Sequence, residues 1–403
     1  MQPFVPAEIV QRLRKRFYRL YGDASEPCME RLRTLIGRYG VGLEPEPADE
    51  HWNQTDSVLI TYADMVRTAD EKPLATLKRF VDKRLAGLIR TIHVLPFFPY
   101  SSDEGFSVID YREVHHGFGS WKDIEALGER FDLMFDLVLN HVSRRSDWFR
   151  QFCNGILPAR QYFIEADPET DLSAVTRPRA SPLLTQVNTR DGERYVWTTF
   201  SEDQIDLDFS NPDVLFEFLD LLLFYIAKGV RILRLDAIAY LWKKIGTACI
   251  HLPETHEAVK LLRDVVELVA PQVLLLTETN VPNEENISYF GDGDEAHMVY
   301  QFSLPPLLLH ALHTGNARYL NEWAMSLPVL EPGTTFFNFT ASHDGVGVRP
   351  LEGLIPDEEF AGLLEAVQKR GGHVSTKRNT DGSKSPYELN ISYFDALSSP
   401  GKR

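Results

Sequence analysis

The feature that most restricts the fold of this chain is the alternation, after residue 50, of short apolar runs with amphipathic runs. The apolar runs have the length and residue types of β-strands, and the amphipathic runs keep helical spacing. Strand-like runs occur at residues 57–62, 89–96, 132–141, 231–236, 273–278, 298–303 and 336–344. Helix-like runs lie between or after them, at 73–85, 120–130, 213–228, 256–270, 305–313 and 357–370. This alternation favours parallel strands with crossover helices, and seven such units predict an α/β fold, a (β/α)8 TIM barrel rather than an open sheet.

Two parts of the sequence do not fit a simple barrel. The first 50 residues contain apolar positions at helical spacing and end in a segment rich in Pro and Glu, which predicts a helical extension. The interval after the third strand is too long for one helix and rich in Pro, Arg, Asp and Thr, which predicts an inserted subdomain. The predicted domains are a helical extension (1–50), a first part of the barrel (51–142), an inserted subdomain B (143–210) and a second part of the barrel (211–403).

Composition excludes several classes of protein. The formal net charge of -16 argues against a nucleic-acid-binding surface, which usually needs a basic excess. The three cysteines, Cys28, Cys153 and Cys249, lie far apart, so we expect neither a disulfide framework nor a structural zinc site, and a reducing cytosol fits best. No run has the length of a signal-peptide core or a membrane span. We therefore expect a cytoplasmic protein without a membrane or nucleic-acid partner, and a homo-oligomer is left open.

The fourth strand-like run, RILRLD, carries two charged residues in an otherwise apolar segment. Side chains alternate along a strand, so Arg234 and Asp236 point to one face, and Leu233 and Leu235 to the other. A buried carboxylate needs a partner or its pKa rises, and Arg234 supplies one. On these residues alone, a structural ion pair at a strand end and a functional site both remain open.

Polar residues also mark the ends of the other predicted strands, where barrel enzymes carry their active sites. They are Asp136, Asn140 and His141 after the third strand, Glu278 after the fifth, His343 and Asp344 after the seventh, and Asp103, in a loop that also carries the aromatic Phe106, after the second. Carboxylates at the ends of several strands predict a mouth lined with acids. Paired carboxylates are the working groups of glycoside chemistry, in which one attacks the anomeric carbon and the other protonates the leaving oxygen.

Four segments resemble, in order, the conserved regions of the α-amylase clan of glycoside hydrolases. They are DLVLNH, RILRLDA, LLTETN and NFTASHD. The resemblance implies that Asp236 is the nucleophile, Glu278 the general acid/base and Asp344 the stabiliser of the transition state. It also implies that His141 and His343 bind glucose and that Arg234 holds Asp236.

Further segments resemble the sucrose phosphorylase branch of that clan, namely 97–111, 200–208, 246–256 and 301–312. This resemblance places Asp103, Phe106, Phe200, Gln204 and Tyr240 in the wall of the glucose pocket. It implies that phosphate replaces water as the second nucleophile and yields α-glucose 1-phosphate. Arg177 and Arg179 match an arginine segment of these enzymes and are candidates for binding phosphate, which suits arginine; a solvated surface pair is the alternative.

Two departures from sucrose phosphorylases, Asn280 and the helical extension, resemble the glucosylglycerate phosphorylases, as do segments 167–179, 289–302 and 385–393. We therefore expect cleavage of 2-O-α-glucosyl-D-glycerate by phosphate, with Asn280 at the phosphate or acceptor site. Sucrose or sucrose 6-phosphate phosphorylase, an α-glucoside hydrolase and an inactive barrel remain alternatives. The family continues through an eighth barrel strand and a C-terminal β-domain, so we expect a barrel that stops before both.

No cofactor is expected, because inorganic phosphate acts as a substrate. No metal is expected either. The pair His115–His116 has no further ligands nearby in sequence, and residues 292–295 lack the spaced ligands of a calcium loop.

Overall fold

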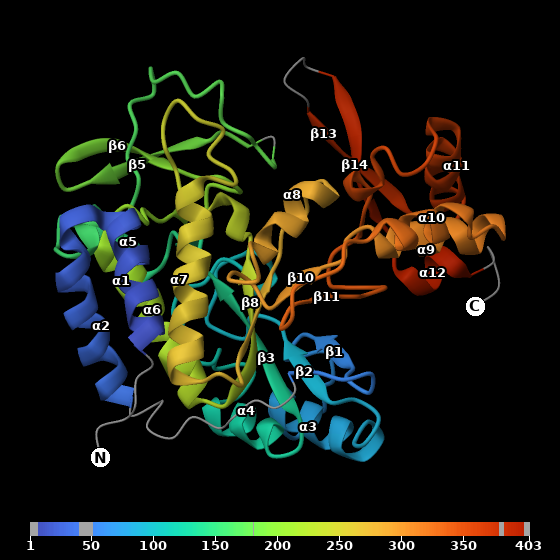
Figure 1. Ribbon diagram of the computed structural model, residues 1–403, viewed down its shortest axis with the longest axis horizontal. Coiled ribbons are helices and arrows are strands. Elements are labelled where there is room, and N and C mark those ends of the chain that lie inside the picture. The colour runs from blue at the N-terminus through green and yellow to red at the C-terminus, as the bar shows by residue number, and fades with distance from the viewer. Residues whose placement is uncertain (1–6, 40–50, 180, 379–382, 399–403) are drawn as a thin grey trace. The chain divides into compact units, whose positions relative to one another are not determined.

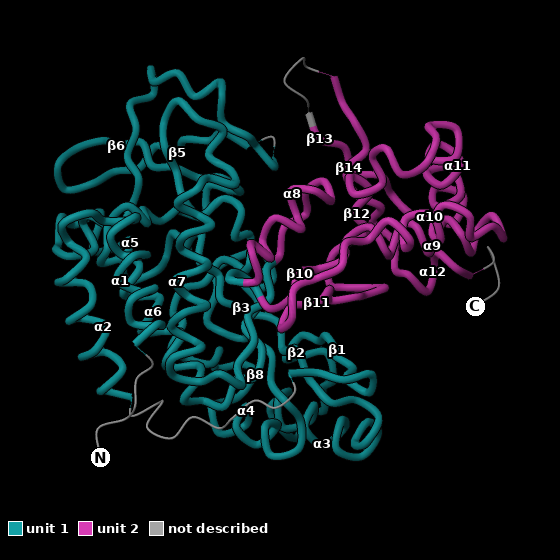
Figure 2. The backbone as a smooth tube through the Cα atoms, in the orientation of Figure 1, with its two compact units in different colours: residues 1–277, 294–296 teal, residues 278–293, 297–403 magenta. Residues whose placement is uncertain are grey.

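The computed structural model describes residues 7–39, 51–179, 181–378 and 383–398 (Figure 1). It divides into two compact units, which Figure 2 shows in different colours. Unit 1 comprises residues 1–277 and 294–296, and unit 2 comprises residues 278–293 and 297–403. These units do not coincide with the predicted domain boundaries, which stay a prediction. Among the described residues, no helix has the length and apolar character needed to cross a membrane.

Unit 1 is built on parallel strands that neighbour one another in chain order. They are β1 (Val58–Thr61), β2 (Thr91–Val94), β3 (Asp132–Val138), β8 (Val230–Asp236) and β9 (Leu274–Thr277). The connecting helices are α3 (Pro73–Arg84), α4 (Trp121–Gly128), α6 (Pro212–Ala227) and α7 (Pro253–Val269). The predicted alternation of strands and helices is confirmed here. The register places Asp136 opposite Arg234 and Val138 opposite Asp236, so the polar ends of β3 and β8 lie side by side.

The helical extension forms two helices, α1 (Ala7–Tyr21) and α2 (Ser25–Tyr39), joined by the 3-10 turn Gly22–Ala24. Buried Phe17 of α1 stacks on Phe216 of α6 with ring centroids 5.9 Å apart. Arg16 of α1, itself buried, donates to Glu257 and Asp264 of α7. The helices are therefore part of unit 1 and not a loose arm. The predicted connector at 44–50 lies outside the described residues, as do residues 1–6 and 40–43.

The interval after β3 forms small antiparallel sheets and short helices. Its elements are β4 (His141–Ser143), α5 (Asp147–Cys153), a 3-10 turn (Ala159–Gln161), β5 (Leu184–Thr189), β6 (Gly192–Trp197) and β7 (Gln204–Asp206). Strand β4 pairs with β7, so that His141 lies opposite Asp206 and Ser143 opposite Gln204. Buried Trp197 anchors a small core together with Cys249 and Leu183. The pairing of β4 with β7 places the last strand of the insertion beside the chain that directly follows β3.

Unit 2 contains two further parallel strands, β10 (Met298–Tyr300) and β11 (Thr335–Phe337). Its helices are α8 (Asn283–Ile287), α9 (Leu304–Thr314), α10 (Arg318–Ser326), α11 (Asp357–Gln368) and α12 (Tyr393–Leu397), with 3-10 turns at Ser288–Phe290 and Arg349–Leu351. All seven predicted strands are thus present. After β11 the described chain forms an antiparallel sheet, β12 (Val346–Gly347), β14 (Lys384–Asn390) and β13 (His373–Arg378), in that order. This sheet was not predicted. Buried Leu307, Val348, Val367 and Leu389 form the core that joins it to the helices.

Candidate active site

A buried chain of polar and charged side chains lies on the neighbouring strands β2, β3 and β8. Arg234 Nη1 donates to Asp136 Oδ1 and to Asp236 Oδ1, each at 2.6 Å. The second oxygen of Asp136, Oδ2, lies 2.8 Å from His93 Nε2. All four residues are buried, and the side chains of His93, Asp136 and Arg234 are at most 3% exposed. The strand therefore keeps Arg234 and Asp236 together as an ion pair, and a second carboxylate shares the guanidinium.

The electrostatic environment of Asp236 opposes its ionisation in part. Burial raises the pKa of Asp236 above its ordinary value, the positive charge of Arg234 lowers it, and the negative charge of Asp136 raises it again. The weak solvation that raises this pKa also makes the ionised carboxylate a better nucleophile. Little hydration is lost when one of its oxygens forms a bond. The arginine keeps the group from being neutralised outright. Such a residue can act as a nucleophile.

The residues predicted to wall the glucose pocket come together in unit 1. Gln204 Nε2 donates to Asp103 Oδ2 at 2.8 Å and lies 3.1 Å from His141 Nε2. The centroid of the Phe200 ring lies 5.4 Å from that of His141 and 5.4 Å from that of Tyr240. Tyr240 is the last residue of the 3-10 turn Ile238–Tyr240. The structure therefore brings these predicted residues into one polar and aromatic cluster.

His141 is held in one orientation within this cluster. Its Nδ1 accepts from Asn140 Nδ2 at 3.2 Å, and its Nε2 lies 3.1 Å from the carbonyl oxygen of Phe106. Burial lowers the pKa of His141, so the neutral ring is favoured. A neutral imidazole with its proton on Nε2 donates it to the Phe106 carbonyl oxygen, and this bond fixes the orientation of the ring.

The loop after β2 has a strained backbone next to the cluster. Asp103 and Glu104, in the 3-10 turn Asp103–Gly105, have positive φ angles of 55° and 49°. At Gly105 a Cβ atom would lie 2.6 Å from the carbonyl oxygen of Pro96, so only glycine fits. The Phe106 ring lies beneath the Arg234 guanidinium, 5.7 Å from its carbon. Non-glycine residues in the left-handed region are concentrated at functional sites, and here they aim Asp103 and Phe106 at the cluster.

A buried lysine, which was not singled out from the sequence, contacts residues next to the cluster. Lys243 Nζ lies 2.7 Å from Asp206 Oδ2, and Asp206 also accepts from the Thr199 amide at 2.8 Å. Lys243 donates to Asn140 as well. Asn140 neighbours His141 in the chain, so this ammonium fixes the residues that hold the histidine. Sequence offered no signal for the contact, because its partners are far apart in the chain.

The described residues contain no group of three or more His, Cys, Asp or Glu side chains that could hold a metal ion. The rings of His115 and His116 stack on each other, 4.7 Å apart. Asp294 and Glu295 lie next to Lys260, 2.9 and 3.6 Å from its nitrogen.

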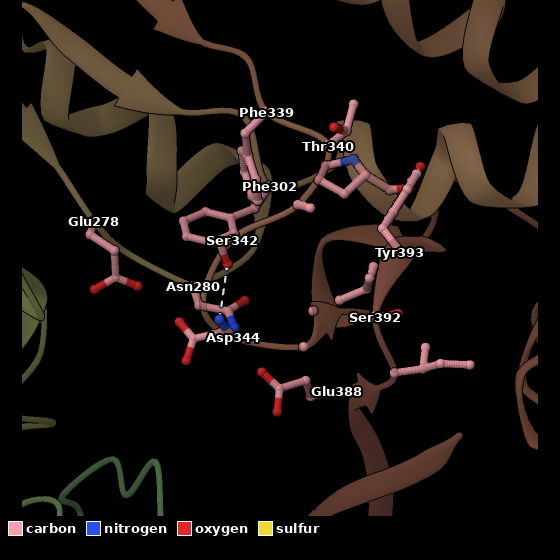
Figure 3. A pocket seen from close by; sticks show the side chains of 16 residues that line it. Glu278, Asn280, Phe302, Phe339, Thr340, Ser342, Asp344, Glu388, Ser392 and Tyr393 are labelled. Atoms are coloured by element: carbon pink, nitrogen blue, oxygen red, sulfur yellow. Dashed lines mark hydrogen bonds between the residues drawn. The ribbon is translucent and has the colours of Figure 1, made fainter. Parts of the chain in front are cut away.

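A pocket of about 160 Å³ lies within unit 2 and contains three more of the predicted residues. Figure 3 shows Glu278, Asn280 and Asp344 lining it together with Glu388 of β14. Its wall also includes aromatic and hydroxyl-bearing side chains, Phe302, Phe339, Tyr393, Thr340, Ser342 and Ser392. No cationic side chain is among the described residues that line it. Carboxylates beside aromatic rings suit a ligand rich in hydroxyl groups, because the carboxylates accept from hydroxyls and the rings pack on C–H faces.

The loop that carries His343 and Asp344 is packed tightly onto β14. At Gly345 a Cβ atom would lie 2.5 Å from the carbonyl oxygen of Leu389, so the close approach requires glycine. The Asp344 amide donates to Ser342 Oγ at 3.2 Å, and His343 Nε2 lies 3.4 Å from Asp344 Oδ2. The side chain of His343 is 10% exposed and that of Asp344 is 60% exposed. Asp344 is thus presented on a fixed loop with its carboxylate accessible.

The two arginines of the insertion have a different setting. Arg177 and Arg179 are both exposed, and Arg177 donates to the carbonyl of Ser181. None of the contacts among the described residues of unit 1 joins either arginine to the buried cluster. Their role in binding phosphate stays a prediction, as do the roles of the other site residues.

Comparison with known proteins gives the same family that the four motifs resemble. The family model described as "Alpha amylase, catalytic domain" matches residues 85–327. The chain is 53% identical over 351 residues to a glucosylglycerate phosphorylase of Escherichia coli, covering 87% of this chain and 63% of that one. It is 50% identical over 398 residues to a glucosylglycerate phosphorylase of Spirochaeta thermophila, covering 97% and 68%.

Among solved structures, the chain is similar to sucrose 6F-phosphate phosphorylase from Thermoanaerobacter thermosaccharolyticum. The TM-score is 0.75 at 28% sequence identity, with 86% of this chain and 72% of that one covered. The chain spans less than two thirds of the length of the Escherichia coli relative and 68% of that from Spirochaeta thermophila. The match of the catalytic-domain model, the identity to these relatives and the barrel strands agree: the chain belongs to the alpha-amylase family.

Proposed function

We propose that this chain is a retaining glycoside phosphorylase. It transfers the α-glucosyl group of 2-O-α-glucosyl-D-glycerate to phosphate, and releases α-D-glucose 1-phosphate and D-glycerate. The observation that carries the proposal is the buried pairing of Asp236 with Arg234, 2.6 Å apart, in a chain that is 50–53% identical to enzymes named glucosylglycerate phosphorylases. A carboxylate held in this way suits covalent catalysis on a sugar.

In the first step of the proposed reaction, an oxygen of Asp236 attacks the anomeric carbon. A glucosyl ester forms, the bond from that carbon to the glycerate oxygen breaks, and Glu278 gives its proton to the departing oxygen. Asp344 accepts hydrogen bonds from sugar hydroxyls as positive charge develops on the ring. His141, His343, Asp103, Gln204 and the aromatic residues Phe106, Phe200 and Tyr240 hold the glucose.

In the second step, a phosphate oxygen attacks the same carbon and the ester to Asp236 breaks. Glu278, now ionised, takes a proton from the attacking phosphate if that oxygen carries one. Two displacements at one carbon restore the α configuration, so the product is α-D-glucose 1-phosphate. Phosphate is a substrate here, and the proposed reaction needs neither a cofactor nor a metal.

Phosphate and glycerate are both anions, so the proposed acceptor site needs cationic partners. The pocket in unit 2 offers Asn280 but no cation among its described lining residues. Arg177 and Arg179 of the insertion, both exposed, are the candidates for this role. We propose a cytoplasmic enzyme of small-molecule substrates. Its assembly into a homo-oligomer is left to measurement.

The reverse reaction tests the proposal directly. The full chain is given α-D-glucose 1-phosphate with D-glycerate, fructose, fructose 6-phosphate or water alone, and phosphate release is followed. Release that depends on D-glycerate supports the proposal. Release with fructose or its phosphate assigns the chain to the sucrose phosphorylases instead, and equal release with water alone assigns it to the hydrolases. If no acceptor gives phosphate release, the proposed activity is contradicted for this chain.

A further inference from the structure

A carboxylate of the insertion gathers serine hydroxyls from the loop that follows β2. Asp203 Oδ2 accepts from Ser101 Oγ at 2.5 Å and from Ser107 Oγ at 2.9 Å. Ser102 Oγ donates to the same oxygen. Asp203 is half-buried and directly precedes β7, which begins at Gln204. One oxygen atom therefore joins three hydroxyls of one loop to the segment that carries Gln204, and we call Asp203 and these three serines the serine clamp.

The chemistry of Asp203 suits this arrangement, because three hydroxyls donate to one oxygen atom. A carboxylate oxygen only accepts, and hydrogen bonds to a charged oxygen are roughly twice as strong as those between neutral groups. The backbone of Asp203 is held as well, since its carbonyl oxygen accepts from the Arg144 amide at 2.8 Å and lies 3.1 Å from Ser107 Oγ. Ser143 Oγ of β4 lies 2.5 Å from Ser101 Oγ. Because Ser101 gives its own proton to Asp203, Ser143 is the donor in that contact.

The serines of the clamp flank the strained turn that carries Asp103. Ser102 directly precedes Asp103, and Ser107 follows it after a few residues. Asp103 and Glu104 have φ angles of 55° and 49°. Such left-handed backbone at non-glycine residues is unfavourable and persists only where the surrounding structure fixes it. Hydrogen bonds from both sides of the turn to the one carboxylate of Asp203 supply such a constraint.

Gln204 connects the serine clamp back to the same turn. Its Nε2 donates to Asp103 Oδ2 at 2.8 Å, and its Oε1 accepts from Ser201 Oγ at 2.8 Å. Asp203 and Gln204 are neighbours in the chain, and so are Ser102 and Asp103. The two hydrogen bonds and the two stretches of backbone therefore close a ring. A shift of Asp203 changes where the Asp103 carboxylate lies relative to the Gln204 amide.

We propose that Asp203 is a positioning residue for the glucosyl group, because the serine clamp sets the place of Asp103 relative to Gln204 and hence the geometry in which both bind the sugar. The inference rests on the proposed function, since it takes Asp103 and Gln204 as glucose-binding residues. Asp203 acts through these two side chains and not on the reacting atoms. A binding group that is misplaced by about 1 Å can reduce the rate by about 10²-fold, so loss of the clamp should be visible in catalysis.

A double-mutant cycle tests whether Asp203 acts through Asp103. Phosphate release from α-D-glucose 1-phosphate at fixed D-glycerate gives kcat/KM for the full chain, for Asp203→Asn, for Asp103→Asn and for the double variant. We expect Asp203→Asn to lower kcat/KM about tenfold and Asp103→Asn to lower it further. In the Asp103→Asn background, Asp203→Asn should cause a further loss of about twofold or less, because the group to be positioned is already gone. Losses that multiply independently would overturn the inference.

Variants of one serine decide the matter if Asp203→Asn does not fold. Ser102→Ala removes a hydroxyl donor from Asp203 and should lower kcat/KM about fivefold. Ser102→Thr keeps the hydroxyl, and the backbone there is extended, with a φ of -160°, which suits a β-branched residue. Its kcat/KM should stay near the wild-type value. Equal falls in the two variants would overturn the inference, because the hydroxyl would then not be what matters.

Ser120→Ala is the matched control for a serine–carboxylate contact with a structural role. Ser120 Oγ lies 2.8 Å from Asp123 Oδ2 in the capping box that begins α4. Loss of this cap should lower the temperature of thermal unfolding and leave kcat/KM unchanged. Thermal unfolding is therefore recorded for every variant, so that a loss of stability is distinguished from a loss of positioning.

The outcomes separate the inference from the function on which it rests. A wild type that releases phosphate with D-glycerate, while Asp203→Asn and Ser102→Ala lose stability but keep the wild-type kcat/KM, overturns the inference alone and leaves the clamp a structural contact. A wild type that releases no phosphate with any acceptor overturns the proposed function and the inference with it.

Discussion

Lys243 and Asp206 form a buried ion pair, with Nζ 2.7 Å from Oδ2 and side chains that are 3% and 0% exposed. The pair connects the chain just after β8 to the last strand of the insertion. Asn140, at the end of β3, contacts both members. One ammonium therefore joins three segments of unit 1 that are far apart in the chain.

The first prediction concerns this pair. Lys243→Met should lower the free energy of unfolding by about 3–5 kcal/mol, because Asp206 is left buried without its cation. Lys228→Met is the matched control, since Lys228 pairs with Glu125 at the surface at 2.7 Å and should cost at most about 1 kcal/mol. Denaturant unfolding of both variants measures the difference. Equal losses of unfolding free energy in the two variants would show that the buried pair contributes no more to stability than the surface pair.

The second prediction concerns Asp236, the proposed nucleophile. Asp236→Asn should reduce turnover by about 10⁴-fold or more, because the amide does not form the glucosyl ester. The fold should persist, since Asp136 still pairs with Arg234 at 2.6 Å. Phosphate release from α-D-glucose 1-phosphate measures the first effect, and thermal unfolding the second. Turnover at the wild-type rate would remove Asp236 from its assigned role.

The third prediction concerns the loop that presents Asp344. Gly345→Ala puts a Cβ atom 2.5 Å from the Leu389 carbonyl, so the loop or β14 must shift, at a cost of about 1–3 kcal/mol and with reduced kcat. Gly362→Ala is the control, because Gly362 lies in α11 with open space around it. That change should raise stability by about 0.5–1 kcal/mol. Unfolding and steady-state kinetics of the two variants separate strain from helix propensity. Normal kcat in Gly345→Ala would show that the loop tolerates the shift.

The fourth prediction concerns pH. The pKa of Asp236 is raised by burial, so kcat/KM should fall on acidification at a higher pH than an ordinary aspartate would give. Arg234 lowers that pKa, since its charge favours the carboxylate. Arg234→Gln should therefore move the acid limb of the profile to still higher pH. Arg234, Asp136 and His141 are among the charged or titratable groups that act on Asp236, so profiles are compared at constant ionic strength. A limb that moves to lower pH would contradict the assignment.

The same shift has a consequence for folding stability. The folded protein holds a proton on Asp236 more tightly than the unfolded chain does, so this group favours the folded state less as pH rises from the ordinary aspartate pKa through the raised one. His141 acts in the opposite direction. Its pKa is lowered by burial, so its contribution is complete above the ordinary histidine pKa and is lost as pH falls through the lowered value.

The sequence predicted the parts of the molecule that depend on local pattern. The apolar runs of β2, β3, β8 and β9 are buried, and their periodicity and spacing identified them. Asp136 and Arg234 were predicted at the ends of two strands, and the pairing of β3 with β8 in the structure places them opposite each other. The pocket cluster of Asp103, His141 and Gln204 was reached through resemblance.

The contacts that were missed join residues far apart in the chain. No sequence pattern near Lys243 predicts its ion pair with Asp206. No pattern in the β2 run predicts the contact between His93 and Asp136 either. The antiparallel sheet of unit 2 was missed for a different reason. Strand β12 has two residues, and β13 is largely half-exposed and polar, so neither gives a clear alternation of apolar and polar positions.

Apart from residues 294–296, unit 1 is a continuous segment that ends at Thr277, and Glu278 is the next residue. On the ribosome, the predicted glucose-binding residues of unit 1 therefore emerge before Glu278, the proposed proton donor, does. Chains generally fold from the N-terminus as they are made. A nascent chain made up to Thr277 would carry Asp236 with its arginine but not Glu278, so we expect it to be unable to protonate a leaving group.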